Sequence, residues 1–355
     1  MARRGERPKG SRFGFRAWRW LALLGVPVVP FAALLLWAHS GARPTEPDLV
    51  LRFEVDAYED RRALAERLQR AGLVQHPQLF SWYLALNGEV EPGAHVLRPG
   101  LSAADLIGRL TRSRRRERVK LTLPEGLNLY QVAGRMQAAQ VSCEQDFIDA
   151  ARKKNLLDEL GIQAGSVEGY LFPATYDFQV DSTPEEVIRR LVREARKRLR
   201  AVGSSSWIER RGWGELELLT LASMIEKEAQ VPEERPLISS VFHNRLDSAE
   251  FEKRRFLQSD PTSAYACFAE PARVPACGGW TGKVTPALNR DPANRYSTYV
   301  TQGLPPGPIA SPGEAALRAA VAPAETDYLF FVARGAGRHH FSRSYDEHKR
   351  AIDKP

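Results

Sequence analysis

The 355-residue sequence contains only three cysteines, Cys143, Cys267 and Cys277. Three cysteines are too few for a disulfide framework, and their spacing does not match a zinc site. Cys267 and Cys277 lie ten residues apart. They can close a loop as a disulfide in an oxidising compartment or remain two free thiols, and the sequence leaves both states open.

The common catalytic sequence motifs are also missing. The chain has no G-x-S-x-G, no H-E-x-x-H, no P-loop and no G-x-G-x-x-G in a suitable context. Among its seven histidines, His339 and His340 are adjacent near the C-terminus, where a solvated or core-edge role is the better interpretation than metal ligation. We therefore predict that the protein uses no metal and no cofactor.

The net charge of +8 does not indicate a nucleic-acid-binding face, because the positive charge is confined to two stretches. Residues 1–19 carry seven Arg or Lys against one Glu, and residues 112–120 carry six against one. These stretches account for +11, which leaves about −3 for the rest of the chain. We predict no nucleic-acid partner and interpret the second stretch as a solvated connector.

One long uncharged run follows the basic N-terminal tail. Trp20–Ala38 is nineteen residues without a charge, roughly 28 Å as a helix, which is close to the thickness of a bilayer core. The run is longer than the apolar region of a cleaved signal peptide, the competing interpretation. We predict a cytoplasmic tail (1–19), a transmembrane helix (20–38) and a linker (39–49), with the remainder exported across the inner membrane to the periplasm.

The exported part begins with a small unit that we place at residues 50–118. Residues 51–55 alternate apolar and charged side chains as a half-buried strand does, and residues 60–71 have helical periodicity that stops at Gly72. A second helix over 79–86, a strand near 94–97 and a helix capped by Ser102 and Asp105 complete the pattern. The unit is therefore a small α/β unit.

The next segment has a similar pattern. Eight positions of the first unit are identical or similar to positions 68 residues later; they are Phe53, Val55, Leu64, Ala65, Arg67, Leu68, Gln69 and Ala71, matching Leu121, Leu123, Val132, Ala133, Arg135, Met136, Gln137 and Ala139. We interpret this as two strand–helix units of one design, with chance similarity of amphipathic helices as the alternative.

We assign residues 119–355 to a larger mixed α+β domain, so the fold class is α+β. Its middle part has helical periodicity, whereas residues from Phe256 onward are rich in proline, glycine, asparagine and tyrosine. Long irregular loops in a compact domain are usually functional or disordered, and the aromatic content favours order here. A capped helix near 311–323 and two closing strands, 328–334 and 339–342, complete the domain.

Two glutamates, Glu226 and Glu228, follow an apolar run with Lys227 between them. If residues 216–229 are helical, both lie on the shoulders of one apolar stripe and Lys227 points away from it. A carboxyl group at the edge of an apolar face has the raised pKa that a general acid needs. A charged surface helix is the alternative, and periodicity does not choose between the two glutamates.

Several motifs resemble the YceG-like family, the membrane-bound endolytic murein transglycosylases. They occur in the family's order between about Leu121 and Lys349 and read "LASMIEKEA", "ISSVFHNRL", "LQSDPT", "YSTY", "GLPPGPIASPG" and "HHFS". The resemblance implies a peptidoglycan lyase that cuts glycan strands internally between N-acetylmuramic acid and N-acetylglucosamine and leaves 1,6-anhydro ends. It also implies that the first soluble unit is LysM-like. The partners it implies are glycan strands, the membrane, and peptidoglycan synthases or division proteins.

The family pattern also suggests roles for individual residues. The catalytic glutamate of the family is the second of its "EKE" triplet, which is Glu228 here. Sugar rings stack on aromatic faces and bind planar amides, so we predict five substrate-binding residues: Asn244, Gln258, Asp260, Tyr265 and Tyr299. For Asp260, bracing the loop before Pro261 is an equally good interpretation. Ser297 replaces the family's usual asparagine, so a sugar contact at that position is in doubt.

Two other functions compete with this prediction. The chain could be a non-catalytic, membrane-anchored peptidoglycan-binding protein, and Ser297 is the feature that favours this alternative. It could also be a cytoplasmic pyridoxal-phosphate lyase, but the export signal and the lack of a suitable lysine setting speak against that.

Overall fold

The computed structural model describes residues 32–41, 49–247 and 256–353. They form two compact units that meet between Glu117 and Arg118, one residue before the predicted boundary. Most of the predicted transmembrane segment, residues 20–31, lies outside the described residues. In the described part of the chain, no helix combines the length and the apolar character needed to cross a membrane.

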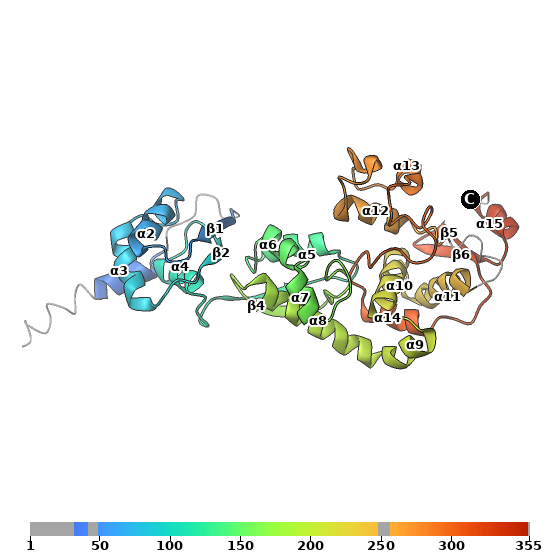
Figure 1. The fold of residues 1–355 in the computed structure, drawn as a ribbon, viewed down its shortest axis with the longest axis horizontal. Coiled ribbons are helices and arrows are strands. Elements are labelled where there is room, and N and C mark those ends of the chain that lie inside the picture. The colour runs from blue at the N-terminus through green and yellow to red at the C-terminus, as the bar shows by residue number, and fades with distance from the viewer. Residues whose placement is uncertain (1–31, 42–48, 248–255, 354–355) are drawn as a thin grey trace, which may run out of the picture. The chain divides into compact units, whose positions relative to one another are not determined.

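The first unit has the element order β-α-α-β-α (Figure 1). Its elements are β1 (Leu51–Val55), α2 (Arg61–Arg70), α3 (Pro77–Asn87), β2 (Gly93–Leu97) and α4 (Ala103–Leu110). β1 and β2 pair antiparallel, and Leu51 lies opposite Leu97. Asp60 caps α2 and Ser102 caps α4 through hydrogen bonds from backbone N–H groups of the first turn. These local signals, together with one buried face per element, explain why the sequence predicted this unit well.

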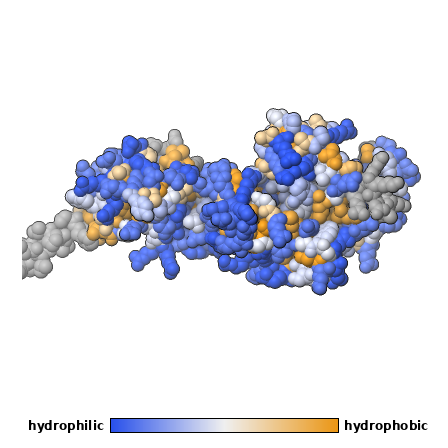
Figure 2. Space-filling model, in the orientation of Figure 1, coloured by the Kyte–Doolittle hydropathy of each residue, from blue (hydrophilic) through white to orange (hydrophobic). Residues whose placement is uncertain are grey.

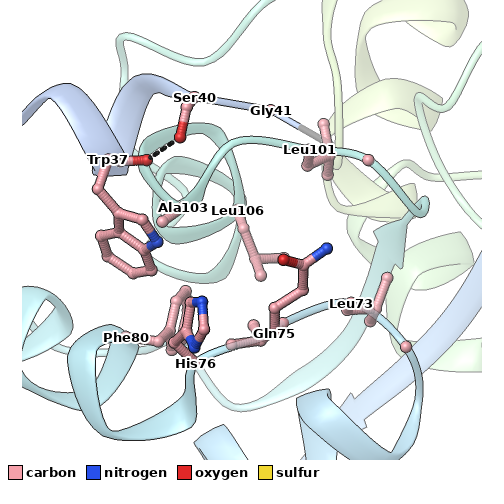
Figure 3. Close-up of a pocket in the computed structure, with 13 residues that line it drawn as sticks. Trp37, Ser40, Gly41, Leu73, Gln75, His76, Phe80, Leu101, Ala103 and Leu106 are labelled. Atoms are coloured by element: carbon pink, nitrogen blue, oxygen red, sulfur yellow. Dashed lines mark hydrogen bonds between the residues drawn. The ribbon is translucent and has the colours of Figure 1, made fainter. Parts of the chain in front are cut away.

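A cavity of about 250 Å³ lies between the loops that follow α2 and β2 in this unit. The rings of Trp37, His76 and Phe80 face it, and Ser40 Oγ donates to the Trp37 carbonyl at 2.7 Å (Figure 3). Residues 32–39 form a helix whose Ala38 is fully buried in the core of the unit. The C-terminal end of the predicted transmembrane segment therefore packs on the first unit.

The second unit holds all the candidate site residues. Its first elements are β3 (Arg118–Thr122), α5 (Leu129–Ala138), α6 (Glu144–Ala150), α7 (Lys154–Glu159), β4 (Thr175–Gln179), α8 (Pro184–Ala201) and α9 (Ser204–Arg211). The later ones are α10 (Glu215–Glu228), η1 (Pro232–Glu234), α11 (Arg235–Asp247), α12 (Asp260–Ala269), η3 (Pro275–Cys277), α13 (Pro286–Arg290), α14 (Glu314–Val321), β5 (Phe330–Gly335), β6 (Arg338–Ser342) and α15 (Tyr345–Ile352). The pairs β3–β4 and β5–β6 are antiparallel, so the described residues form short two-stranded sheets among many helices, a mixed α+β fold.

The beginning of the second unit repeats the local design of the first. α2 and α5 each contain ten residues and begin 68 residues apart, with Asp60 and Asn128 as their N-caps. Gly72 and Gln140, which follow the two helices, both have a left-handed backbone conformation. Later in the units, Ser102 caps α4 and Thr183 caps α8, 81 residues apart. The element order β-α-α-β-α is thus present in both units, with α7 inserted in the second.

Helix α10 lies in the core of the second unit and is more buried than its periodicity indicated. All eight residues from Leu218 to Ile225 are buried, including Thr220 and Ser223. The predicted apolar stripe was therefore too narrow, because α10 contacts α11, α12 and α14. Figure 1 shows α10 between α14 and the segment carrying α12. Thr220 and Ser223 satisfy their hydroxyls by donating to the carbonyls of Leu216 and Thr220, respectively.

A substitution at Gly169 tests the packing of the second unit, because this residue lies against Pro308. The φ of +83° at Gly169 is a left-handed conformation, and a methyl group added there would lie 2.5 Å from Pro308 Cγ. Gly169→Ala should therefore lower the free energy of unfolding by about 2–4 kcal/mol, measured by urea denaturation. Gly165→Ala is the matched control, because a methyl group there meets nothing within 4 Å and its φ is not left-handed. Equal stability of the two variants would contradict the packing described here.

Candidate active site

Glu228 is the last residue of α10, and its side chain is largely removed from solvent. Ser259 Oγ donates a hydrogen bond of 2.5 Å to Glu228 Oε1. Burial raises the pKa of Glu228 to about 7, although the hydrogen bond from Ser259 opposes the rise. The nearby Asp260 carboxylate raises this pKa further, and His339 and Arg245 lower it. Glu228 is therefore able both to give up and to accept a proton near neutral pH.

Two basic side chains near Glu228, His339 and Arg245, are held by other partners. His339 Nδ1 lies 2.7 Å from Glu234 Oε2, and the backbone N–H of His339 also donates to this carboxylate. Arg245 donates to the carbonyls of Leu257 and Leu329 and lies over the ring of Phe330. Burial lowers the pKa of Arg245 to about 10. These contacts fix both side chains in place without using the Glu228 carboxyl group as their partner.

Glu226 has a different setting from Glu228, although both lie at the edge of α10. Its carboxylate accepts a hydrogen bond from the backbone N–H of Gly313 at 3.1 Å and pairs with Arg235 at 3.4 Å. Only 7% of its side chain is exposed. Glu226 therefore connects α10 to the start of α14 and to α11. Lys227 is exposed, as predicted from the helical spacing, and its Nζ donates to the Gly126 carbonyl.

Sequence reasoning did not single out Ser259, although it contacts Glu228 directly. Ser259 is 1% exposed and its backbone N–H donates to Thr298 Oγ1 at 2.9 Å. Thr262 Oγ1 donates to the Ser259 carbonyl and lies 3.0 Å from Thr298 Oγ1. A buried hydroxyl network thus holds the residue that hydrogen-bonds Glu228. The signal was present in "LQSDPT", whose serine lies between the two predicted residues Gln258 and Asp260.

Asp260 and Tyr299 lie together beside Glu228. Asp260 is the first residue of α12, and its Oδ1 accepts hydrogen bonds from Tyr299 Oη at 2.7 Å and Asn289 Nδ2 at 2.8 Å. The bracing role considered for Asp260 is therefore present in the structure. Both Asp260 and Glu228 interact electrostatically with Tyr299, whose pKa is raised chiefly by burial. A role of either residue in substrate binding remains a prediction.

The other predicted substrate residues have varied surroundings. Asn244 Nδ2 donates to the carbonyls of Thr326 and Tyr328, so this amide group holds the segment before β5. The exposed Gln258 has a left-handed backbone, and its N–H donates to the Thr298 carbonyl. Tyr265 is only 4% exposed and donates its hydroxyl to Glu168. Of the five, Tyr265 and Asn244 have the most clearly structural contacts, and their assignment to substrate rests on the sequence alone.

Glu168 is a second buried carboxyl group that the sequence did not single out. It accepts hydrogen bonds from the Leu129 N–H and from Tyr265 Oη, both at 2.8 Å. Burial raises the pKa of Glu168 to about 7 against the effect of these hydrogen bonds. Because its partners are the first residue of α5 and a residue of α12, Glu168 connects the repeated segment to the helix that begins beside Ser259.

The irregular segment from 256 to 313 is ordered by buried polar contacts. Ser297, at the family's asparagine position, is buried and donates to the Asn289 carbonyl at 2.6 Å. Asn294 Oδ1 accepts from the backbone N–H groups of Tyr296 and Ser297, so an amide nearby organises the same turn. Cys267 and Cys277 form a disulfide with their Cα atoms 5.3 Å apart, which answers the question left open by the sequence.

Within the described ranges, no group of three or more His, Cys, Asp or Glu side chains is arranged to hold a metal ion. A single carboxyl group that titrates near 7 can act first as a general acid and then as a general base.

The pKa of Glu228 has a consequence for stability. Between pH 4.5 and about 7 the folded protein retains a proton on Glu228 that the unfolded chain has lost, so the free energy of unfolding falls as the pH rises through this window. Glu228→Gln cannot ionise. We expect this variant to be more stable than the wild type at pH 8, by an amount on the order of 1–3 kcal/mol, and to lose this advantage below pH 4.5.

Denaturant unfolding at several pH values measures this difference. Glu168 titrates in both proteins, so its contribution cancels in the comparison. If the difference in free energy of unfolding between the wild type and Glu228→Gln does not change with pH, the raised pKa of Glu228 is contradicted.

Comparisons with known proteins agree with these motifs. The model of the YceG-like family matches residues 53–354. The chain is 30% identical over 339 residues to an endolytic murein transglycosylase of Bacillus subtilis, covering 90% of this chain and 89% of that protein. It is 30% identical over 314 residues to an endolytic murein transglycosylase of Streptococcus pneumoniae, covering 80% of this chain but 54% of the longer relative.

A solved structure is also similar. The crystal structure of a yceG-like protein from Listeria monocytogenes superposes with a TM-score of 0.56 and 26% sequence identity, covering 85% of this chain and 99% of that one. The family match covers most of the chain, including both units and Glu228. The chain therefore belongs to the YceG-like family.

Proposed function

We propose that the chain is an endolytic murein transglycosylase, a lyase that cuts the glycan strands of peptidoglycan internally. The observation that carries this function is Glu228, a partly buried carboxyl group with a pKa of about 7 at the end of α10. The relatives from B. subtilis and S. pneumoniae carry the same functional name. Cleavage of nascent strands between N-acetylmuramic acid and N-acetylglucosamine would terminate their elongation.

One carboxyl group is sufficient for this reaction. Protonated Glu228 gives its proton to the glycosidic oxygen, and the bond from that oxygen to C1 of the muramic acid breaks. The C6 hydroxyl of the same sugar forms a bond to C1, and its proton passes to the Glu228 carboxylate. The products are an N-acetylglucosamine end and a 1,6-anhydro-muramic acid end. Because the attacking oxygen belongs to the substrate, water is not consumed and a second catalytic carboxylate is not needed.

The hydrogen bond from Ser259 lowers the pKa of Glu228. The Ser259 hydroxyl donates to Glu228 Oε1, which leaves the other carboxyl oxygen to face a substrate. Gln258, Asp260 and Tyr299 are exposed or partly exposed residues near Glu228, and we propose these three as the substrate contacts. Asn244 and Tyr265 support the same region through their contacts with the segment before β5 and with Glu168.

We also propose that the protein is anchored in the inner membrane with its N-terminus in the cytoplasm and both units in the periplasm. The basic tail and the uncharged run Trp20–Ala38 support this location. The disulfide Cys267–Cys277 supports an oxidising compartment. The β1-α2-α3-β2 order of the first unit supports a LysM-like unit that contacts glycan, and synthases or division proteins of the same membrane are the proposed partners.

Product analysis tests the proposed function. Purified protein is incubated with peptidoglycan, and the strand ends are identified by mass spectrometry. We expect anhydro-muramic acid ends from the wild type and a loss of about 10²–10⁴-fold or more in Glu228→Gln, because the acid and base step is removed. Glu226→Gln makes the same chemical change two residues away and keeps an acceptor for the Gly313 N–H, so it should retain activity.

Each other outcome has a defined meaning. Equal activity in Glu228→Gln, or loss of activity only in Glu226→Gln, would overturn the assignment of Glu228. Reducing ends would show hydrolysis rather than transglycosylation. Binding of peptidoglycan without any cleavage would favour the non-catalytic anchor.

The pH profile of cleavage tests the contact from Ser259. The hydrogen bond stabilises the ionised form of Glu228, so Ser259→Ala should raise the pKa above about 7. Cleavage requires protonated Glu228 at its first step, so the loss of activity at alkaline pH should move to higher pH in this variant. Ser259→Thr keeps the hydroxyl and should retain the wild-type profile. An alkaline limb that is unchanged in Ser259→Ala would contradict the role of this contact.

A further inference from the structure

A basic groove lies on the second unit, between β4 and helix α8. It has a volume of about 590 Å³ and is lined by Ala174, Thr175, Tyr176, Arg190, Arg193, Glu194, Lys197, Arg198 and Arg200. Five of these residues are cationic and one is acidic. Strongly hydrophilic side chains dominate the surface along α8 in Figure 2. None of the residues that contact Glu228 lines this groove, so it is separate from the candidate active site.

The cations occupy one stripe of α8. Arg190, Arg193, Lys197 and Arg200 recur at intervals of three, four and three residues, which places them on one face of a helix. All four are exposed, whereas the opposite face of α8 is buried in the core. Among the described residues, the side chains of Arg193 and Arg200 have neither a hydrogen-bond nor an ion-pair partner. Two guanidinium groups are thus available at the groove.

The other charged groups in the groove have partners. Arg190 Nη1 donates to the Asp177 carbonyl at 2.7 Å, and its guanidinium group lies over Tyr176 and Phe178. Glu194 accepts from Arg198 Nε at 2.8 Å and lies 3.7 Å from Lys197 Nζ. Arg198 also pairs with Glu314. The one acidic side chain is therefore neutralised within the groove, and the free charge is positive.

The first unit shows that this stripe is not required by the shared fold. In the first unit, Arg109 of α4 donates to the Val96 carbonyl. In the second unit, Arg190 donates to the Asp177 carbonyl, and each of these two residues lies 81 positions after its counterpart in the first unit. Helix α4 ends at Leu110, whose counterpart at this offset is Leu191. Helix α8 continues ten residues further, to Ala201. Of the two units, only the second has this extension, and Arg193, Lys197 and Arg200 lie on it.

We propose that the groove between β4 and α8 binds the carboxylates of the peptide stems that project from a glycan strand. This inference rests on the proposed function, since it names a second part of the same substrate. Planar guanidinium groups match carboxylates bidentately, and Arg193 and Arg200, about two helical turns apart, can each bind one carboxylate in the groove. A lipid surface is a less suitable partner, because a flat anionic membrane contacts protruding cations more readily than a groove.

The proposed role is specificity for strands that still carry their stems. Each exposed arginine–carboxylate contact is weak by itself, but the two contacts of the groove add to those made at the active site. The enzyme should therefore prefer stem-bearing strands over strands from which an amidase has removed the peptides.

Binding of the full-length protein in detergent, with Glu228→Gln to prevent cleavage, tests this inference. We expect stem-bearing strands to bind about tenfold or more tightly than amidase-treated strands. Arg193→Glu/Arg200→Glu should remove this preference, and Arg193→Lys/Arg200→Lys should keep most of it because the charge remains. The single variants Arg193→Glu and Arg210→Glu make the same change of charge at two exposed arginines. Arg210 lies outside the groove, and its side chain has no partner among the described residues. Arg210→Glu is therefore the control for Arg193→Glu and should bind like the parent.

Cleavage assays separate failure of this inference from failure of the proposed function. With Glu228 intact, Arg193→Glu/Arg200→Glu should cut amidase-treated strands at the wild-type rate and lose only the advantage on stem-bearing strands. Normal cleavage without any stem preference in the wild type would overturn the inference and leave the function intact. Loss of binding to vesicles of anionic phospholipid in the double variant, with strand binding unchanged, would overturn it by identifying a membrane contact. No cleavage by the wild type would remove the proposed function itself.

Discussion

The candidate active site depends on one carboxyl group held at the end of a buried helix. Helix α10 packs against α11, α12 and α14, and its last residue, Glu228, is partly buried at the edge of these contacts. Desolvation there opposes ionisation of Glu228, and the hydroxyl of Ser259 partly offsets it. The balance of these two effects leaves the carboxyl group able to exchange a proton near neutral pH, which is the property that the proposed reaction needs.

Other polar contacts of the second unit hold the elements around Glu228 in place. Glu226 accepts a hydrogen bond from the backbone N–H of Gly313, and Ser223 accepts one from that of Ile309. These two bonds fix the loop before α14 against α10. Glu168 connects α5 to α12, and the hydroxyl network of Thr262 and Thr298 holds Ser259 at the beginning of α12. Buried polar contacts therefore contribute to the order of the long irregular segment, together with apolar burial.

Local features of the fold could be predicted from the sequence because they depend on neighbouring residues. The cap at Ser102, the end of the helix at Gly72 and the alternation in β1 are all visible within a few positions. The choice between Glu226 and Glu228 was different, since both lie on the shoulders of the same helix. Their partners come from Gly313 and Ser259, residues far along the chain, and helical periodicity contains no information on such contacts. For the same reason the depth at which α10 is buried was underestimated, and the internal partner of Tyr265 was not foreseen.

The central claim concerns the protonation of one side chain, and a direct titration tests it. Selective ¹³C labelling of glutamate, with Glu228→Gln used to assign the signal, allows the carboxyl resonance of Glu228 to be followed by NMR from pH 3 to pH 9. A midpoint near 7 is the result that burial of Glu228 predicts. A midpoint near 4.5, the ordinary value of a solvated glutamate, would contradict the account.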